Sequence, residues 1–200
     1  MVVVFWAATG SLHAGEADLK IPALDQVKFD GLGGLSGLTL MYLGIGMCAI
    51  GALFGLAQYW WTNKLPVHKS MSDVSLTIWE TCKTYLLQQG KFLAILWLLI
   101  ASCILFYFKV LEQKSSGDVT VILLASVLGI LGSYGVAWFG IRINTRANSR
   151  TAFSALKGNP LKMLSIPLQS GMSVGLLLVS VELFFMISIL VVLPRELVGP

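Results

Sequence analysis

Four long apolar runs, separated by polar connectors, dominate this 200-residue chain and cover about residues 38–61, 92–108, 119–141 and 166–193. Because an α-helix rises about 1.5 Å per residue, about 20 residues cross a hydrocarbon core ~30 Å thick, and each run is long enough or nearly so. A membrane β-barrel would show segments of about ten residues that alternate between polar and apolar, and these runs do not alternate. The pattern predicts an all-α fold, a polytopic transmembrane bundle of about four membrane-spanning helices within residues 38–200.

The composition supports an integral membrane protein. Hydrophobic residues make up 56% of the chain and charged residues 12%, whereas about 25% charged residues is typical of soluble domains. The net charge is +4, but the cations lie in connectors between apolar runs, where Lys and Arg set membrane topology. The sequence therefore predicts a lipid bilayer as a partner and no nucleic acid.

The connectors predict which side of the membrane each end of the chain faces. Residues 62–91 carry four Lys against two acids, and residues 142–165 carry five cations and no acid. These five are our candidate topology-determining residues: Arg142, Arg146, Arg150, Lys157 and Lys162. If every run crosses, both connectors lie on one side of the membrane, and their positive charge predicts that this side is the cytoplasm. We expect the membrane to be the inner membrane of a bacterial cell. Both termini then face outward. The alternative role for these cations, which we favour less than the topological one, is to raise the positive potential near an anionic substrate.

The N-terminal residues fit the same orientation. In residues 1–14 a short apolar run precedes Leu12, His13 and Ala14, which resembles the end of a signal peptide and predicts a signal-peptide remnant. A plain apolar tail is the alternative. Residues 15–37 are polar and rich in Gly, and we interpret them as an extracytoplasmic lead-in to the first crossing.

Helices are also predicted within the connectors. Residues 72–89 read as an amphipathic helix that Ser70 or Ser72 can cap and that continues into the second crossing. Its predicted inner face comprises Val74, Ile78, Cys82, Tyr85 and Leu86. The third connector begins as a helical extension and ends at the turn signal of residues 158–160, Gly-Asn-Pro.

Small residues recur at helical spacing in three of the apolar runs. Lipid tails are as apolar as leucine, so transmembrane helices associate where small residues allow their backbones to approach closely. The predicted packing stripes are Gly51 and Gly55, then Gly129, Ser133 and Ala137, and lastly Gly171 and Gly175.

Glu182 is the one acid deep within an apolar run, where an unpartnered carboxylate is costly. It is a candidate for an ion relay or for a buried partner contact. The alternatives are a protonated acid that hydrogen-bonds a nearby Ser or carbonyl, and a ring of such acids in an ion-conducting oligomer. No phosphate-binding loop, HExxH motif or carboxylate cluster occurs, so no catalytic, substrate-binding or metal-ligating residue is predicted.

Three segments of the chain resemble one family. The run RANSRTA at 146–152 resembles the ANxRT element of the membrane-bound, ion-pumping inorganic pyrophosphatases. The stretch after it has a similar SGxxxG pattern at Ser170, Gly171 and Gly175, and residues 80–93 resemble the family's amphipathic lead-in to its second crossing. The likeness covers roughly residues 38–193.

The resemblance implies a pump of roughly sixteen helices that forms a homodimer, hydrolyses pyrophosphate with Mg²⁺ in the cytoplasm and moves H⁺ or Na⁺ outward. The family's substrate-binding carboxylates come in a later run like DVGADLVGKVE, which these residues lack. We therefore expect the N-terminal part of such a pump, with the rest of the polypeptide as its partner. Mg²⁺, with K⁺ or Na⁺ as further ions, would bind elsewhere in the pump. The alternative is a self-contained four-helix membrane scaffold or assembly protein without catalysis.

Overall fold

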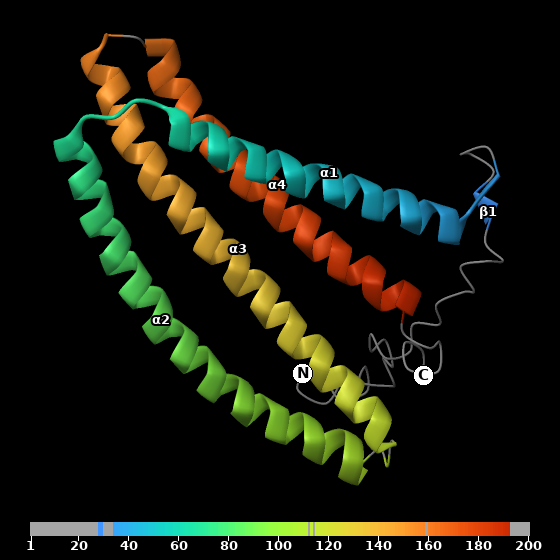
Figure 1. Ribbon diagram of the computed structural model, residues 1–200. Helices are drawn as coiled ribbons and strands as arrows, with labels where there is room; N and C mark the ends of the chain where they lie inside the picture. The colour runs from blue at the N-terminus through green and yellow to red at the C-terminus, as the bar shows by residue number, and fades with distance from the viewer. Residues whose placement is uncertain (1–27, 30–33, 112, 114, 159, 193–200) are drawn as a thin grey trace, which may run out of the picture. The chain divides into compact units, whose positions relative to one another are not determined.

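The computed structural model describes residues 28–29, 34–111, 113, 115–158 and 160–192 (Figure 1). Its helices are α1 (Gly37–Lys64), α2 (Lys69–Phe106), α3 (Ser116–Leu156) and α4 (Pro160–Val192), and a π-helical turn, η3 (Tyr107–Leu111), follows α2. Strands β1 (Lys28–Phe29) and β2 (Leu35–Ser36) form a short antiparallel pair. The predicted signal-peptide remnant, residues 1–14, and most of the predicted lead-in lie outside the described residues.

The chain divides into two units, residues 1–43 with 187–200, and residues 44–186. In the first unit Lys28 pairs with Ser36 and Phe29 with Leu35. The Ser36 hydroxyl accepts a hydrogen bond from the backbone N–H of Thr39 at 3.3 Å, which satisfies a free donor at the start of α1. The second unit holds the packed lengths of the four helices and is the one considered below.

The predicted all-α bundle is confirmed. Each of the four helices is long and apolar enough to cross a membrane. They are longer than the apolar runs require: the 41 residues of α3 span about 60 Å, twice the ~30 Å hydrocarbon core. The predicted helix at 72–89 and the second crossing are one continuous helix, as expected. Parts of α2 and α3 therefore extend beyond the hydrocarbon.

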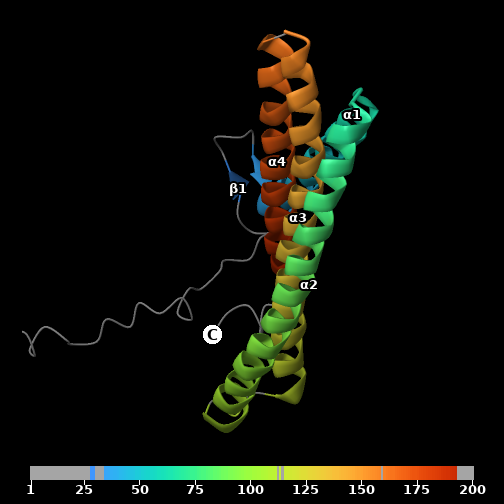
Figure 2. The same ribbon diagram turned by 90° about the vertical axis from the view of Figure 1, so that its left-hand side faces the viewer.

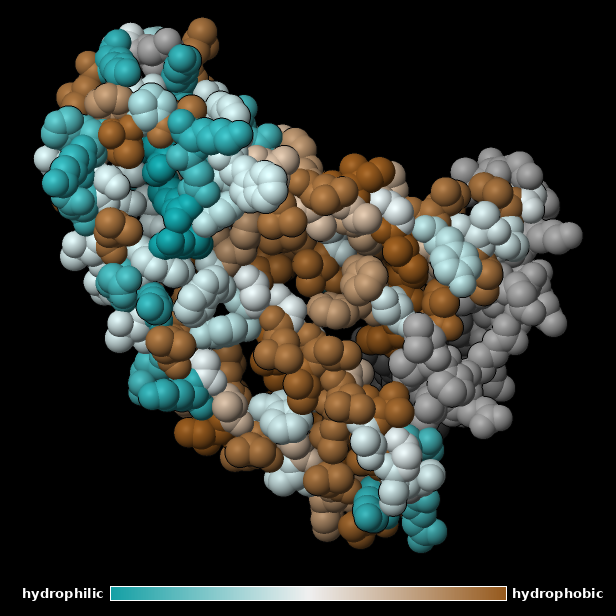
Figure 3. Space-filling view, viewed as in Figure 1, coloured by the Kyte–Doolittle hydropathy of each residue, from teal (hydrophilic) through white to brown (hydrophobic). Residues whose placement is uncertain are grey.

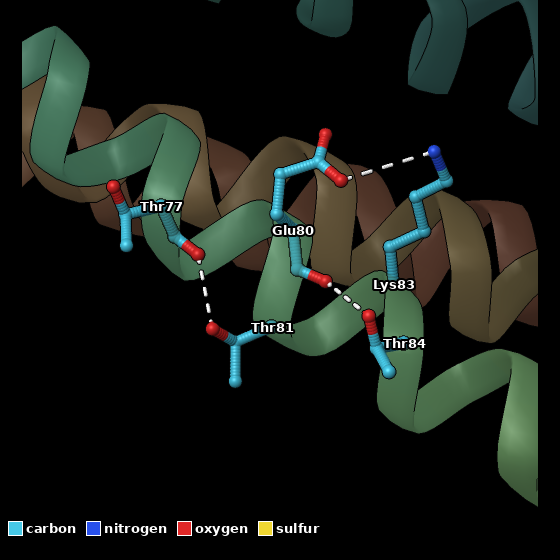
Figure 4. A network of polar contacts seen from close by, with 5 residues as sticks. All are labelled: Thr77, Glu80, Thr81, Lys83 and Thr84. Carbon is cyan, nitrogen blue, oxygen red and sulfur yellow. Dashed lines mark hydrogen bonds and ion pairs between the residues drawn. The ribbon is translucent and has the colours of Figure 1, made fainter.

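The first half of α2 has the polar surface expected of such an extension. The Thr77, Thr81 and Thr84 hydroxyls each donate to the carbonyl four residues earlier. Figure 4 shows the bonds of Thr81 and Thr84, together with Lys83 at 3.9 Å from Glu80. Hydrophilic residues gather over this end of the helices, whereas hydrophobic residues cover their middle lengths (Figure 3). We call the polar end, formed by residues 58–79 and 138–170, the basic end of the bundle.

Helix α3 is the central element of the second unit and contacts each of the other helices (Figures 1 and 2). Toward α2, the Trp97 indole donates to the Ser126 hydroxyl at 2.9 Å and the Tyr134 hydroxyl donates to the Leu86 carbonyl at 2.8 Å. Toward α4, Gly140 faces Val174. Hydrogen bonds between helices and close backbone approach hold helices together where lipid removes the hydrophobic driving force.

Two predictions need correction at α2. The cap is His68, whose Nδ1 accepts from the Ser70 N–H at 3.3 Å, so neither Ser70 nor Ser72 caps the helix. Leu86 is buried as predicted, but Val74, Ile78 and Tyr85 are exposed. Besides Leu86, the buried residues of α2 are Ser75, Trp79 and Ala101. The Ser75 hydroxyl donates to the Thr145 carbonyl at 2.7 Å, a polar contact that fixes the inward face of this helix.

The small-residue stripes are confirmed in one helix of three. Gly51 and Gly55 pack α1 against Ser180 and Ser173 of α4, and the Ser173 hydroxyl donates to the Gly55 carbonyl at 3.1 Å. The stripe at Gly129, Ser133 and Ala137 faces no other described helix, and Gly132, Val136 and Gly140 form the inward face of α3. In α4 the inward residues are Ser170 and Ser173, and neither Gly171 nor Gly175 contacts another described helix.

The predicted turn between the last two helices is confirmed. Helix α3 ends at Leu156, and Gly158 has φ +67°, a left-handed conformation that glycine adopts without a steric penalty. Helix α4 begins at Pro160, a residue suited to the first helical position because its missing N–H would have no partner there.

An arginine clamp as the candidate functional site

Three arginines line one face of α3 at the basic end. Arg142, Arg146 and Arg150 are four residues apart, a spacing that places side chains above one another along a helix. They reach residues of α1 and α2, and we call Arg142, Arg146 and Arg150 with Tyr59, Asn63 and Trp79 the arginine clamp.

Arg142 connects α3 to α2. Its guanidinium lies 4.3 Å from the centroid of the Trp79 ring, close enough for a cation–π interaction. Trp79 is buried and packs edge-on against Trp138 of α3, with the ring centroids 5.5 Å apart. The charged group therefore covers an aromatic pair that already joins the two helices.

Arg146 connects α3 to α1. Its guanidinium lies 5.1 Å from the centroid of the Tyr59 ring, and Nη1 donates to the Asn63 Oδ1. The Tyr59 ring also packs against Phe139, with centroids 5.8 Å apart. The Arg146 side chain thus makes both a stacking contact and a charge-assisted hydrogen bond to the last turns of α1.

Arg150 caps the C-terminus of α1. Its Nη2 donates to the Asn63 backbone carbonyl at 3.4 Å, and its Nη1 donates to the Arg146 carbonyl at 3.0 Å. Asn63 belongs to the last turn of α1, where carbonyls lack intrahelical partners and the helix dipole favours a cation. Arg150 therefore donates to a free backbone carbonyl and also places a positive charge at the C-terminal end of the helix dipole of α1.

A neighbouring contact extends the connection to the fourth helix. The Ser170 hydroxyl of α4 donates to the Asn144 Oδ1 of α3 at 2.7 Å, and Ser170 is buried. Polar contacts at the basic end consequently join α1, α2 and α4 to α3.

The sequence comparisons assign this bundle to a family. A model of the family described as inorganic H⁺ pyrophosphatase matches residues 49–198, three quarters of the chain and the whole arginine clamp. The chain belongs to the inorganic H⁺ pyrophosphatase family. The resemblance seen in the ANxRT element is therefore confirmed.

Two relatives carry informative names. A K⁺-insensitive pyrophosphate-energized proton pump of Chlorobaculum tepidum is 54% identical over 157 residues, which are 78% of this chain and 21% of the relative. A protein of the same name from Pyrobaculum aerophilum is 27% identical over 147 residues, 73% of this chain and 20% of the relative. The chain thus spans about a fifth of the length of these relatives. No solved structure matches it.

In this chain the five candidate cations separate into two groups. Arg142, Arg146 and Arg150 come together in the clamp, while Lys157 and Lys162 are exposed beside the turn. The topological role of all five stays a prediction. Glu182 lies on an exposed face of α4 and makes no hydrogen bond or ion pair with any described residue, so the expected bond to a nearby Ser or carbonyl is not found.

Sequence reasoning missed the partners of the arginines. The spacing of the three arginines was a visible signal for a shared face, but Tyr59, Asn63 and Trp79 lie on other helices, and nothing in their own surroundings marks them. Asn144 and Ser170 were missed for the same reason.

The clamp can supply positive charge and can hold the helices together, and none of its six residues has a carboxylate side chain. Within the described residues no group of three His, Cys, Asp or Glu side chains could hold a metal ion. Mg²⁺ requires several oxygen ligands and suits carboxylates, so these residues do not fit a Mg²⁺ site.

Proposed function

We propose that this chain forms the N-terminal crossings of a membrane pyrophosphatase that couples pyrophosphate hydrolysis to outward proton transport. The observation that carries the proposal is the 54% identity over 157 residues with a pyrophosphate-energized proton pump. On this proposal, Mg²⁺ and pyrophosphate bind to parts of the polypeptide outside these 200 residues, and the complete protein is a homodimer.

The four helices then have a supporting role. The arginine clamp fixes α3 to α1 and α2 at the basic end, which we place on the cytoplasmic side of a bacterial inner membrane, with the N-terminus outside after cleavage of a signal peptide. Arg142, Arg146, Arg150, Lys157 and Lys162 hold this orientation because cations are retained on the cytoplasmic side. On this proposal, the basic end is rigid, and it keeps the helices outside these 200 residues aligned for catalysis.

The names of the two relatives lead us to propose H⁺ as the pumped ion and no requirement for K⁺. In membranes from cells that express the complete reading frame, pyrophosphate hydrolysis should proceed at the same rate with or without K⁺ and Na⁺. A pH-sensitive dye should report acidification of inverted vesicles that a protonophore abolishes. Dependence of transport on Na⁺ would indicate a sodium pump instead, and membranes without any hydrolysis would favour the scaffold alternative.

The orientation can be tested by cysteine labelling. Leu161, beside the turn between α3 and α4, is 79% exposed, and Val110, in η3 beyond the opposite end of α2, is 60% exposed. In a background in which Cys48, Cys82 and Cys103 are replaced, Leu161→Cys should react with an impermeant maleimide only after the cells are opened. Val110→Cys, the matched control, should react in intact cells. The reverse pattern would contradict the proposed topology.

A further inference from the structure

One face of α4 carries a combination of residues that is poorly suited to contact with lipid. Gly171, Gly175, Val179 and Glu182 are separated by four, four and three residues and share one side of the helix. A Cβ atom at either glycine would meet no atom within 4 Å, Val179 is 58% exposed, and Glu182 is also exposed. We call these four residues the open face of α4.

The outward face of α2 provides the contrast. Phe92, Ile95 and Leu98 are all exposed and all large and apolar, and Leu98 has 63% of its surface accessible. A surface of this kind suits acyl chains. The open face of α4 instead has two residues without side chains and a carboxyl group, although all four of its residues belong to the apolar run at 166–193.

Lipid satisfies neither feature of the open face. An acyl chain offers no hydrogen bond to a carboxyl at the depth of Glu182, where such a group needs a partner. A pair of glycines four residues apart gives no advantage against a fluid chain, but it lets the backbone of a second helix approach closely. Both features therefore require protein as the neighbour.

We propose that a transmembrane helix from a part of the same pump polypeptide outside these 200 residues packs on the open face of α4 and supplies a hydrogen-bond donor or a cation to Glu182. The inference rests on the proposed function, because this chain covers 21% of the length of the Chlorobaculum tepidum pump, so most of such a polypeptide lies outside it. A second copy is a poorer occupant. In a two-fold contact centred on this face the two Glu182 carboxyls would meet each other, and like charges in a site of low dielectric repel.

Site-specific photo-crosslinking of the complete protein in its own membrane tests this inference. A diazirine amino acid is placed at Val179, between Gly175 and Glu182, and at Leu98 of α2 as the matched control. After irradiation, Val179 should yield a peptide pair that joins α4 to a segment outside residues 1–200, with the mobility of the monomer retained. Leu98 should yield phospholipid adducts.

Other products at Val179 would overturn the inference. Lipid adducts alone would mean that the open face is exposed to the bilayer, and a product of doubled mass would mean that a second copy covers it. A product joined only to residues 1–200 would likewise exclude the proposed helix. Because the label reports contact whether or not the protein turns over, pyrophosphate hydrolysis by the same unmodified membranes tests the proposed function separately.

Discussion

Replacing Arg146 by alanine should markedly lower the thermal stability of the complete protein, whereas Lys157→Ala should leave it close to wild type. Arg146→Ala removes the donor to Asn63 and the cation over the Tyr59 ring, which together connect α3 to α1. A hydrogen bond to a charged group contributes about 1.5–3 kcal/mol, more than most surface contacts. The measurement is the fraction of purified protein that stays monodisperse in detergent after heating, followed by size-exclusion chromatography.

Lys157 is a matched control because it stands in the same connector and carries the same charge. Its ammonium lies over the ring of Phe153 in the same helix, 4.5 Å from the ring centroid, and makes no described contact with α1. If these cations acted only on topology, the two alanine variants would behave alike, and that result would contradict the clamp. Arg146→Lys should be intermediate, since a lysine keeps the charge but lacks the planar fork that can stack and donate together.

The arginine clamp shows how far the sequence alone could predict this site. The spacing of Arg142, Arg146 and Arg150 indicates a shared face, because the helical repeat is a property of local sequence. The partners Asn63 and Trp79 could not be predicted, because their contacts join residues about 80 positions apart in one case and about 60 in the other, and only the packing of the helices decides such pairs.

The reversed face of α2 has a related physical cause. In a water-soluble protein an apolar stripe points inward, but a membrane helix meets apolar surroundings on both sides, so the stripe of Val74, Ile78 and Tyr85 did not identify the interior. The polar and small residues do so more reliably. Ser75 faces α3, Ser173 faces α1, and Gly51 and Gly55 were the stripe for which the prediction was correct.

Gly132→Ala is expected to destabilise the bundle, although alanine is a better helix former than glycine. A Cβ atom at position 132 would overlap Cε2 of Phe185 and lie 3.2 Å from both Cδ2 and Cζ of that ring. An aromatic ring between two helices cannot move aside as the end of a flexible side chain can, so α3 and α4 must separate. Overpacking of this kind costs about 1–3 kcal/mol. The same heating assay should show a lower midpoint for this variant.

Gly129 supplies the comparison within the same helix, because a Cβ atom there would meet nothing within 4 Å. Gly129→Ala should therefore be neutral or stabilising, by up to about 1 kcal/mol from helix propensity. A second change isolates the cause: in a Gly132→Ala, Phe185→Leu double variant the smaller side chain at 185 makes room for the added methyl, so the two effects should not add. Equal stability of the Gly129→Ala and Gly132→Ala proteins would show that α3 and α4 do not meet at this position, and additive losses in the double variant would place the cost of Gly132→Ala elsewhere in the bundle.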